Sequence, residues 1–439
     1  MIVAPDFPST ESPFIGYSYS YPHKSAYRRL QPAIPLRSLW ECESRDALFL
    51  YFHLPFCEYR CGFCNLFTLA NPDADWVRAY LTQLRTEAVQ VRSAIPAAQF
   101  SRIAIGGGTP TFLNGRELAE FLNIAVDVCG AAPRDVPVSC EASPATLTPR
   151  KAAMLREWGV DRLSLGVQSF DAQEARALGR PQSTRDVLRA IDIAREFRFP
   201  ALNLDLIYGV PGQSMNSWLQ TVRSALRHRP EEIYLYPLYV RELTGLGKTS
   251  CAANNERLTA YREARECLLA EGYEQKSLRM FQLPSVRDAG PVYCCQSDGM
   301  VGLGCGARSY THELHYSTEF AVGRSGVRAI LAEYLSRAPE TFQTAAHGFL
   351  LDAEDQRRRY VILSLLQSDG ISLSDYRRRF ASDVLADLPQ IEELAERELA
   401  EITDDRICLT ASGLELSDAI GPWLYSVRVQ NLMSEFSCR

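Results

Sequence analysis

Three cysteines stand close together in the segment His53-Leu54-Pro55-Phe56-Cys57-Glu58-Tyr59-Arg60-Cys61-Gly62-Phe63-Cys64. Thiolates bind zinc and iron–sulfur clusters, so three thiols within eight residues can converge on one metal centre. A structural zinc site normally takes four protein ligands, and zinc would have to recruit His53 or a distant thiol. An iron–sulfur cubane held by three thiolates leaves one iron open to an external ligand, which suits catalysis. The spacing modestly favours the cluster over zinc. Three buried structural thiols are a weaker alternative, because free core thiols rarely gather in one loop.

Glycines and polar residues follow other short apolar runs. The run Gly106-Gly107-Gly108-Thr109-Pro110-Thr111 lets the backbone approach a ligand closely, although a glycine triplet alone is more often a turn. Glu141, Gln168 and Asp205 each lie at or near the end of an apolar run. Polar groups are costly to bury unless they are paired, so these three side chains are site candidates.

Six strands that alternate with five helices would position these residues. A parallel sheet with right-handed crossovers is the expected result, either a full or partial barrel or an open doubly wound sheet. Both topologies gather ligands at the carboxyl ends of the strands. The predicted strands are 48–53, 102–105, 138–141, 162–167, 201–207 and 233–239, and the predicted helices are 73–93, 117–129, 149–158, 184–197 and 215–228.

We place this repeating core, together with the extension that follows it, at residues 46–335. The two ends of the chain differ from it. Residues 1–45 hold six prolines and are predicted to form an irregular arm over the folded body, with a disordered terminus as the alternative. Residues 345–439 are predicted to form a small, mainly helical, winged-helix-like domain, with helices at 352–367, 373–380 and 391–401 and a strand at 407–410. DNA binding is disfavoured, because the arginines at 357–359 are balanced by nearby acidic residues.

The bulk composition is that of an ordinary globular protein. Apolar residues make up 46% of the 439 residues, charged residues make up 23%, and the formal net charge is -6. These values exclude a disordered scaffold and predict no strong attraction to nucleic acid or anionic membranes. No stretch approaches the roughly 18 apolar residues of a membrane span, so we expect a cytoplasmic protein with no membrane partner. Its 13 cysteines are an odd number and do not suggest a disulfide framework.

The spacing Cys57-x-x-x-Cys61-x-x-Cys64, with an aromatic residue before the last cysteine, resembles the signature of radical S-adenosylmethionine enzymes. The preceding His53-Leu54-Pro55-Phe56 narrows the resemblance to the branch of oxygen-independent coproporphyrinogen III oxidase, its haem-chaperone relatives and the class C radical methyltransferases. The resemblance runs from about Ala47 to Ile330 and is weaker in the tail. It implies a partial six-unit barrel of the radical S-adenosylmethionine type. It also implies a 4Fe-4S cluster on the three cysteines and reductive cleavage of S-adenosylmethionine to a 5′-deoxyadenosyl radical.

The same resemblance implies cofactor contacts at two positions. Residues that match contacts to the S-adenosylmethionine on the cluster are Tyr51, Gly107 and Glu141. Residues that match contacts to a second S-adenosylmethionine are Phe63, Gly108, Thr109, Gln168, Arg180, Asp205 and Leu238.

Four residues are the candidates for catalytic roles: Tyr51, Glu141, Tyr239 and Arg308. Arg308 stands where the oxidase has an aliphatic contact to S-adenosylmethionine, and a guanidinium there indicates an anionic group nearby. Tyr239 belongs to a run in which tyrosines alternate with apolar residues, as in a strand with one polar-capable face. Packing in the core is the alternative role for these tyrosines.

The sequence differs from the motifs that mark each known activity in this branch. The oxidase carries a further cysteine directly after its last cluster ligand, whereas this chain reads Cys64-Asn65-Leu66-Phe67. The chaperones have a motif containing His-Asn, whereas residues 293–299 read Tyr-Cys-Cys-Gln-Ser-Asp-Gly. Residues 236–246 resemble class C methyltransferases more than the oxidase. Cys294 and Cys295 could bind a second cluster, donate thiols or be inert, and an inert or substrate-facing role is favoured.

These departures favour C-methylation, or a related modification, of an unsaturated or heterocyclic substrate. The alternatives are oxidative decarboxylation of the coproporphyrinogen type and a non-catalytic haem chaperone. The expected partners are a small-molecule or peptide-derived substrate and a flavodoxin- or ferredoxin-like electron donor.

Overall fold

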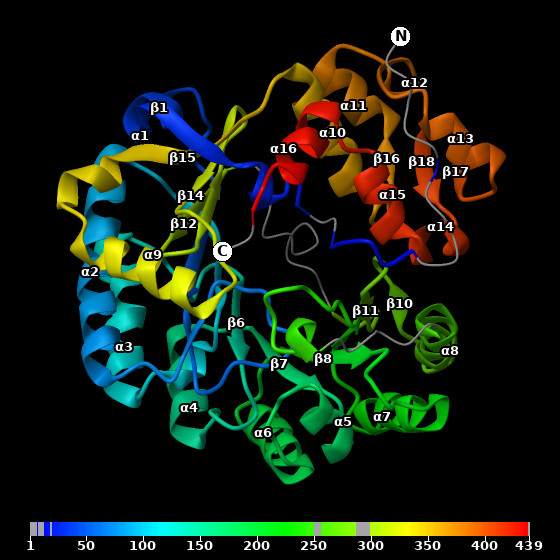
Figure 1. The fold of residues 1–439 in the computed structure, drawn as a ribbon, viewed down its shortest axis with the longest axis horizontal. Helices are drawn as coiled ribbons and strands as arrows, with labels where there is room; N and C mark the ends of the chain where they lie inside the picture. The colour runs from blue at the N-terminus through cyan, green and yellow to red at the C-terminus, as the bar shows by residue number, and fades with distance from the viewer. Residues whose placement is uncertain (1–6, 8–12, 18–19, 250–255, 287–298, 438–439) are drawn as a thin grey trace.

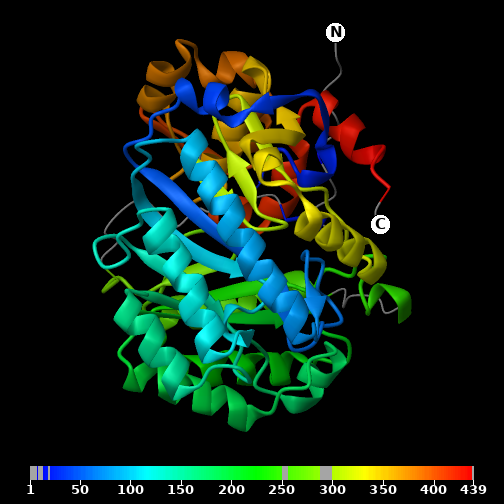
Figure 2. The same ribbon diagram turned by 90° about the vertical axis from the view of Figure 1, so that its left-hand side faces the viewer.

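The computed structural model describes residues 7, 13–17, 20–249, 256–286 and 299–437. Cys294 and Cys295, to which the sequence assigns several possible roles, lie outside these described residues. One mixed sheet runs through the core in the order β1-β15-β14-β13-β12-β2-β5-β6-β7-β8-β9-β11-β10. Helices lie around the outside of this sheet, and the C-terminal domain packs at one end (Figures 1 and 2). No helix in the described part of the chain is long and apolar enough to cross a bilayer.

The six predicted strands form the centre of the sheet, and they are parallel and follow one another in chain order. This arrangement confirms the α/β class. It also fits a partial barrel, because no strand pairing closes the two edges of the sheet among the described residues. The strands are β2 (Leu48–Leu54), β5 (Phe100–Gly107), β6 (Val138–Ala142), β7 (Arg162–Gln168), β8 (Ala201–Tyr208) and β9 (Glu232–Pro237).

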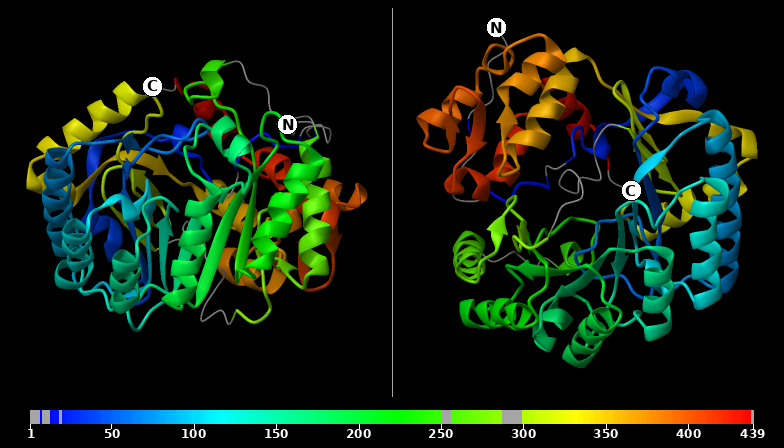
Figure 3. Two further views of the ribbon diagram at one scale, coloured as in Figure 1. Left: turned by 90° about the horizontal axis from the view of Figure 1, so that it is seen from below. Right: turned by 180° about the vertical axis from the view of Figure 1, so that it is seen from behind.

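The crossover helices pack on the convex side of this sheet (Figure 3). They are α2 (Ala74–Ala94), α3 (Gly115–Asn123), α4 (Pro149–Trp158), α5 (Ala172–Ala177), α6 (Thr184–Glu196), α7 (Met215–Arg227) and α8 (Arg257–Ala270). Local sequence starts three of them with reciprocal capping boxes, at Asn114, Ser183 and Ser214. The helix predicted for 117–129 is α-helical only to Asn123 and continues as a π-helical segment, Ile124–Val128.

Antiparallel strands extend both edges of the parallel sheet, and the sequence pattern did not indicate them. On one side, β12 (Met300–Leu303) pairs in parallel with β2 and is followed by β13 (Arg308–Tyr310), β14 (Leu314–Ser317), β15 (Thr344–Leu350) and β1 (Arg28–Pro35). On the other side lie β11 (Met280–Gln282) and β10 (Glu274–Gln275). The helix α9 (Arg324–Ser336) connects β14 to the segment before β15.

The arm predicted to be irregular over 1–45 contains the strand β1 and the short helix α1 (Leu36–Glu41). β1 is an edge strand with little burial and two prolines, Pro32 and Pro35, so it lacks the apolar alternation that marks a strand in sequence. Tyr21 and Tyr27, which precede it, are buried in the core of the C-terminal domain. The arm is therefore an integral part of the fold over these residues.

The C-terminal region is mainly helical, with a small sheet in the order β16-β18-β17, as the winged-helix-like prediction expected. Its elements are α10 (Ala353–Leu365), β16 (Ile371–Ser372), α11 (Leu373–Phe380), α12 (Val384–Asp387), α13 (Ile391–Glu396), β17 (Ala400–Ile402), β18 (Arg406–Leu409), α14 (Ala411–Glu415), α15 (Ser417–Trp423) and α16 (Val427–Ser434). The predicted helix 391–401 was too long. The chain turns at Glu398, which has a φ of 59°, and Ala400 then pairs with β18.

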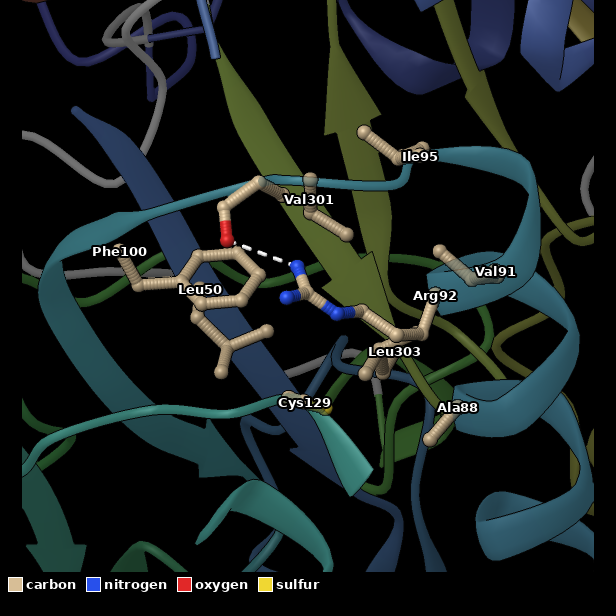
Figure 4. A pocket seen from close by; sticks show the side chains of 10 residues that line it. Leu50, Ala88, Val91, Arg92, Ile95, Phe100, Cys129, Val301 and Leu303 are labelled. Carbon is tan, nitrogen blue, oxygen red and sulfur yellow. Dashed lines mark hydrogen bonds between the residues drawn. The ribbon is translucent and has the colours of Figure 1, made fainter. Parts of the chain in front are cut away.

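The layer between α2 and the sheet is apolar and tightly packed. Figure 4 shows a small cavity there, near the start of β5, with a volume of about 10 Å³. Leu50, Val91, Cys129 and Leu303 are among the side chains that line it. A space of this size holds at most one water molecule, so it is a packing defect and not a ligand site.

Candidate active site

The loop that carries the three cysteines begins where β2 ends. Cys57 belongs to β3 (Phe56–Cys57), which pairs in parallel with β4 (Leu69–Ala70) and so closes the loop at its base. In the middle of the loop, the amide of Gly62 donates to the carbonyl of Leu178 (2.8 Å), and the carbonyl of Gly62 accepts from the amide of Leu246 (2.8 Å). The loop is therefore fixed at its base and at its centre.

The three thiols are free, half-buried and close enough to influence one another. Burial raises the pKa of Cys57 to about 12; a hydrogen bond from Thr109 lowers it, and the neighbouring Cys64 and Cys61 add to the rise. Burial likewise raises the pKa of Cys61, against the effect of Arg180. Metal binding reverses this preference for the neutral thiols, because ligation releases their protons.

The neighbours of the thiols are polar donors. The hydroxyl of Thr109 donates to Sγ of Cys57 (3.5 Å), and Nη1 of Arg180 donates to Sγ of Cys61 (3.4 Å). The hydroxyl of Thr68 lies 3.8 Å from Sγ of Cys64. Donors aimed at sulfur stabilise thiolate and sulfide charge, which is how proteins tune iron–sulfur clusters.

The donor set fits a cluster better than a zinc ion. Among the described residues, no three His, Cys, Asp or Glu side chains form a group that could hold one metal ion. In a cubane each thiolate binds a different iron, so the three sulfurs need not converge on a single point. His53 is also engaged at both ring nitrogens, with the Tyr51 hydroxyl at 3.2 Å and the Phe67 carbonyl at 3.0 Å. It is therefore not free to serve as a fourth zinc ligand.

The glycine loop is tied directly to the cysteine strand. The amide of Gly108 donates to the carbonyl of Leu54 (2.7 Å), and the amide of Thr109 donates to the carbonyl of Phe56 (2.7 Å). A Cβ on Gly108 would lie 2.4 Å from that Phe56 oxygen, and Gly107 has a φ of 107°. Only glycine permits this approach and this backbone conformation, and the approach brings the Thr109 hydroxyl to Cys57.

Glu141 lies in β6 beside the glycine loop, and its Oε2 accepts from the amide of Gly107 (3.2 Å). Its side chain is accessible, yet protein surrounds it on several sides, and burial together with the charge of Asp205 raises its pKa to about 7. A carboxylate that is open to a ligand but poorly solvated is well suited to bind a substituted ammonium group.

Arg180 is buried and makes four polar contacts. Besides Cys61 it donates to the Gly166 carbonyl (2.6 Å), the Ser143 hydroxyl (3.2 Å) and Oε1 of Gln182 (2.7 Å). The last three contacts hold the guanidinium in place, so its position does not depend on a bound group. It supplies a fixed positive charge next to the thiols.

Gln168 and Asp205 lie on neighbouring strands at the same edge. Asp205 accepts from the Asn203 amide (2.9 Å) and the Ser164 hydroxyl (3.2 Å), while burial raises its pKa. Gln168 ends β7 at a bulge with a φ of 68°, a conformation unusual for a residue with a side chain. Backbone conformations of this kind are concentrated at functional sites.

Phe63 and Leu238 pack together in a small apolar cluster that is separate from the main core. Phe63 lies between the second and third cysteines, and Leu238 directly follows β9. The structure therefore brings the two predicted apolar contacts to one place beside the cysteine loop.

Arg308 and Tyr51 flank a glycine. Gly302 of β12 pairs with Tyr51, and a Cβ on Gly302 would lie 2.2 Å from the backbone oxygen of Arg308. The Arg308 guanidinium lies over the ring of Tyr310 at 5.7 Å, and both Arg308 and Tyr51 are half-buried. The antiparallel extension thus carries Arg308 to the neighbourhood of β2, which no local sequence pattern indicated.

Tyr239 has a different environment from the one the sequence suggested. The Tyr239 hydroxyl donates to the carboxylate of Asp418 from the C-terminal domain. The guanidinium of Arg279 donates to the Tyr239 hydroxyl oxygen at 2.8 Å. The hydroxyl is therefore engaged in a contact between domains. Sequence reasoning missed Arg279 and Asp418; the one available signal was that Asp418 is the single charged residue between Leu416 and Leu424.

Comparison with known proteins agrees with this geometry. Residues 51–225 match the radical SAM superfamily, and residues 351–416 match the HemN C-terminal domain. The chain therefore carries a radical SAM domain followed by a HemN C-terminal domain and belongs to the radical SAM superfamily.

Individual relatives are similar over most of their length. The heme chaperone HemW of Bacillus subtilis (strain 168) is 24% identical, over 84% of this chain and 97% of that protein. The oxygen-independent coproporphyrinogen III oxidase of Paracoccus denitrificans (strain Pd 1222) is 27% identical, over 77% of this chain and 76% of that protein. The fold matches the structure of coproporphyrinogen III oxidase (HemN) from Escherichia coli with a TM-score of 0.79 at 22% identity, covering 96% and 99% of the two chains. These relatives support the oxidase or chaperone alternative better than the C-methylation predicted from sequence.

Proposed function

We propose that the protein is a radical S-adenosylmethionine enzyme of the coproporphyrinogen oxidase-like type. In this proposal a hydrogen atom is removed from an unactivated carbon of a carboxylate-bearing small molecule, and the resulting substrate radical loses carbon dioxide and passes one electron to a one-electron acceptor, which leaves a carbon–carbon double bond. One observation carries the proposal. Three free thiols lie beside the donors Thr109 and Arg180, next to a glycine loop and the open carboxylate of Glu141.

Each of these residues has a defined task in this proposal. A 4Fe-4S cluster and S-adenosylmethionine, when bound, supply a carbon radical that can break an unreactive C–H bond. The three cysteines would hold the cluster, and Arg180 and Thr109 would stabilise its negative charge. Glu141 would accept hydrogen bonds from the amino group of S-adenosylmethionine, with the backbone at Gly107 alongside. The Arg308 guanidinium would bind a carboxylate.

Non-catalytic haem carriage is the second candidate. It is favoured by the similarity to the heme chaperone, which extends over 97% of that relative. The C-methylation prediction has no comparable support among these relatives. For either candidate we propose a cytoplasmic protein and, for the enzyme, a flavodoxin- or ferredoxin-like electron donor and a small-molecule or peptide-derived substrate.

The test is anaerobic reconstitution with iron and sulfide, reduction with dithionite, and incubation with S-adenosylmethionine with and without coproporphyrinogen III. The expected result is 5′-deoxyadenosine, together with carbon dioxide whose formation requires coproporphyrinogen III; both are absent in Cys57→Ala. Deoxyadenosine with S-adenosylhomocysteine and no carbon dioxide would replace decarboxylation by methylation. Stoichiometric haem binding without deoxyadenosine would contradict the enzyme proposal and support non-catalytic haem carriage.

A further inference from the structure

Two buried acidic residues of the C-terminal domain reach arginines of the core. α14 and α15 lie on the side of the C-terminal domain that faces α8 and β11 (Figure 1). Glu415 at the end of α14 pairs with Arg262 and Arg265 of α8. Asp418 in α15 pairs with Arg279 at 2.5 Å, and both of these side chains are almost completely buried. The two carboxylates are three residues apart and contact different parts of the core.

The Asp418 contact includes a residue at the edge of the candidate site. Oδ2 of Asp418 accepts from both Arg279 and the hydroxyl of Tyr239, and Arg279 also donates to the Tyr239 oxygen (2.8 Å). Each of these three side chains therefore contacts the other two; Asp418 and Arg279 are almost completely buried, and Tyr239 is half-buried. The other carboxylate oxygen, Oδ1, is buried and has no hydrogen-bond partner among the described residues. Both side-chain hydrogen bonds of the Asp418 carboxylate therefore come from Tyr239 and Arg279.

Tyr239 is the second residue of a segment that runs to the cysteine loop. Its neighbour Leu238 is anchored by a hydrogen bond from its amide to the Tyr208 carbonyl (2.9 Å) and packs in the apolar cluster that includes Phe63. At the far end of the segment, the amide of Leu246 donates to the carbonyl of Gly62 (2.8 Å). Residues 238–246, which we call the 238–246 segment, are therefore hydrogen-bonded to the cysteine loop at Leu246 and share an apolar cluster with Phe63 of that loop at Leu238.

We infer that Asp418 is a positioning residue for the radical site. It acts through Tyr239 and Arg279 to hold the 238–246 segment, and through that segment it orders the loop between Cys61 and Cys64. The C-terminal domain is in this way part of the active-site scaffold and not only a cover for it. The role for cofactor binding rests on the proposed function, whereas the ordering of the loop does not.

Glu415 provides a matched control, because it is also a buried carboxylate in an interdomain ion pair, but its two arginine partners lie on α8 and outside the 238–246 segment. The first measurement is amide hydrogen exchange on the cluster-free full chain, comparing Asp418→Asn with Glu415→Gln. We expect exchange at the amides of Leu238, Leu246 and Gly62 to accelerate at least tenfold in Asp418→Asn and less than twofold in Glu415→Gln. Equal protection in the two variants would overturn the inference.

The second measurement uses the reconstituted protein with S-adenosylmethionine and dithionite alone, scoring 5′-deoxyadenosine and the S-adenosylmethionine dissociation constant. Asp418→Asn should weaken binding about tenfold, and Glu415→Gln should leave it unchanged. Tyr239→Phe keeps the ion pair and removes only the hydroxyl, so it should give a smaller change of the same kind even if Asp418→Asn folds poorly. Wild-type protein that forms no deoxyadenosine even when coproporphyrinogen III is added would refute the proposed function, while the exchange data would still decide on the role of Asp418.

Discussion

Cys57 and Cys129 lie on the same α/β scaffold and have opposite surroundings. Burial raises the pKa of each thiol to about 12. Cys57 has two further thiols and a hydroxyl donor beside it at the carboxyl edge of the sheet, whereas Cys129 lines the small apolar cavity under α2 (Figure 4). A buried thiol is therefore not a sign of function by itself. The neighbouring donors and the open backbone at the strand ends make the difference.

The largest effect that separates the two regions should come from removing each thiol in turn. Cys57→Ala should abolish cluster binding, measured as iron and sulfide per chain and as cluster absorbance, because the remaining two cysteines cannot hold a cubane. Cys129→Ala should keep the full iron content and lose about 1 kcal/mol of unfolding free energy through a slightly larger cavity. Equal iron content in the two variants would contradict the assignment of Cys57 as a cluster ligand and Cys129 as a core thiol.

Gly108→Ala should be the next most damaging change at the carboxyl edge. The new methyl group would lie 2.4 Å from the Phe56 carbonyl oxygen, so the glycine loop must move away from the cysteine strand. We expect a destabilisation of about 2 kcal/mol in urea unfolding, together with at least tenfold lower cluster occupancy. Gly115→Ala is the control, because its new methyl group meets only the Arg150 side chain at 3.5 Å, and it should change neither quantity by much.

The raised pKa of Glu141 predicts that ligand binding at the carboxyl edge of the sheet depends on pH, which the apolar region around Cys129 cannot show. Binding of a substituted ammonium group needs the carboxylate, so S-adenosylmethionine affinity should fall roughly tenfold per pH unit below about pH 7. Glu141→Gln should bind weakly with a flat profile over the same range. In the ligand-free protein, the stability contributed by Glu141 changes with pH in the opposite direction. Because the folded pKa is above the unfolded one, the contribution of this group to stability increases as the pH falls from about 7 toward 4.5. Isothermal titration between pH 5.5 and 8.5 checks the binding prediction.

The smallest of the four effects should come from Arg180→Lys. Lysine keeps the charge but cannot reproduce the contacts to Cys61, Ser143, Gly166 and Gln182 at the same time. Cluster loss under air should be about threefold to fivefold faster than in the wild-type protein, as followed by absorbance. The exposed Arg185→Lys should decay at the wild-type rate, and a matching acceleration there would show that the effect is not local.

Most of the parallel core was predictable from sequence, because its strands are short apolar runs and its helices have amphipathic spacing and local caps. The antiparallel strands were not predicted. β13 and β14 are only three or four residues long, and β1 is a proline-containing edge strand, so none of the three has a usable periodicity. The boundary between α13 and β17 was also missed, because the pairing of Ala400 with Leu409 outweighs the local helical pattern.

The sequence by itself determined the features that depend on neighbours along the chain. The spacing of the three cysteines, the glycines that must approach the cysteine strand, and the order of strands and helices all depend on local geometry. Tertiary structure alone decided that Arg308 lies across Gly302 from Tyr51 and that Asp418 pairs with Arg279, 139 positions away. The reason is physical. A buried charge is tolerated only where the packing of distant segments brings it a partner, and that partner leaves no trace in the residues on either side of it.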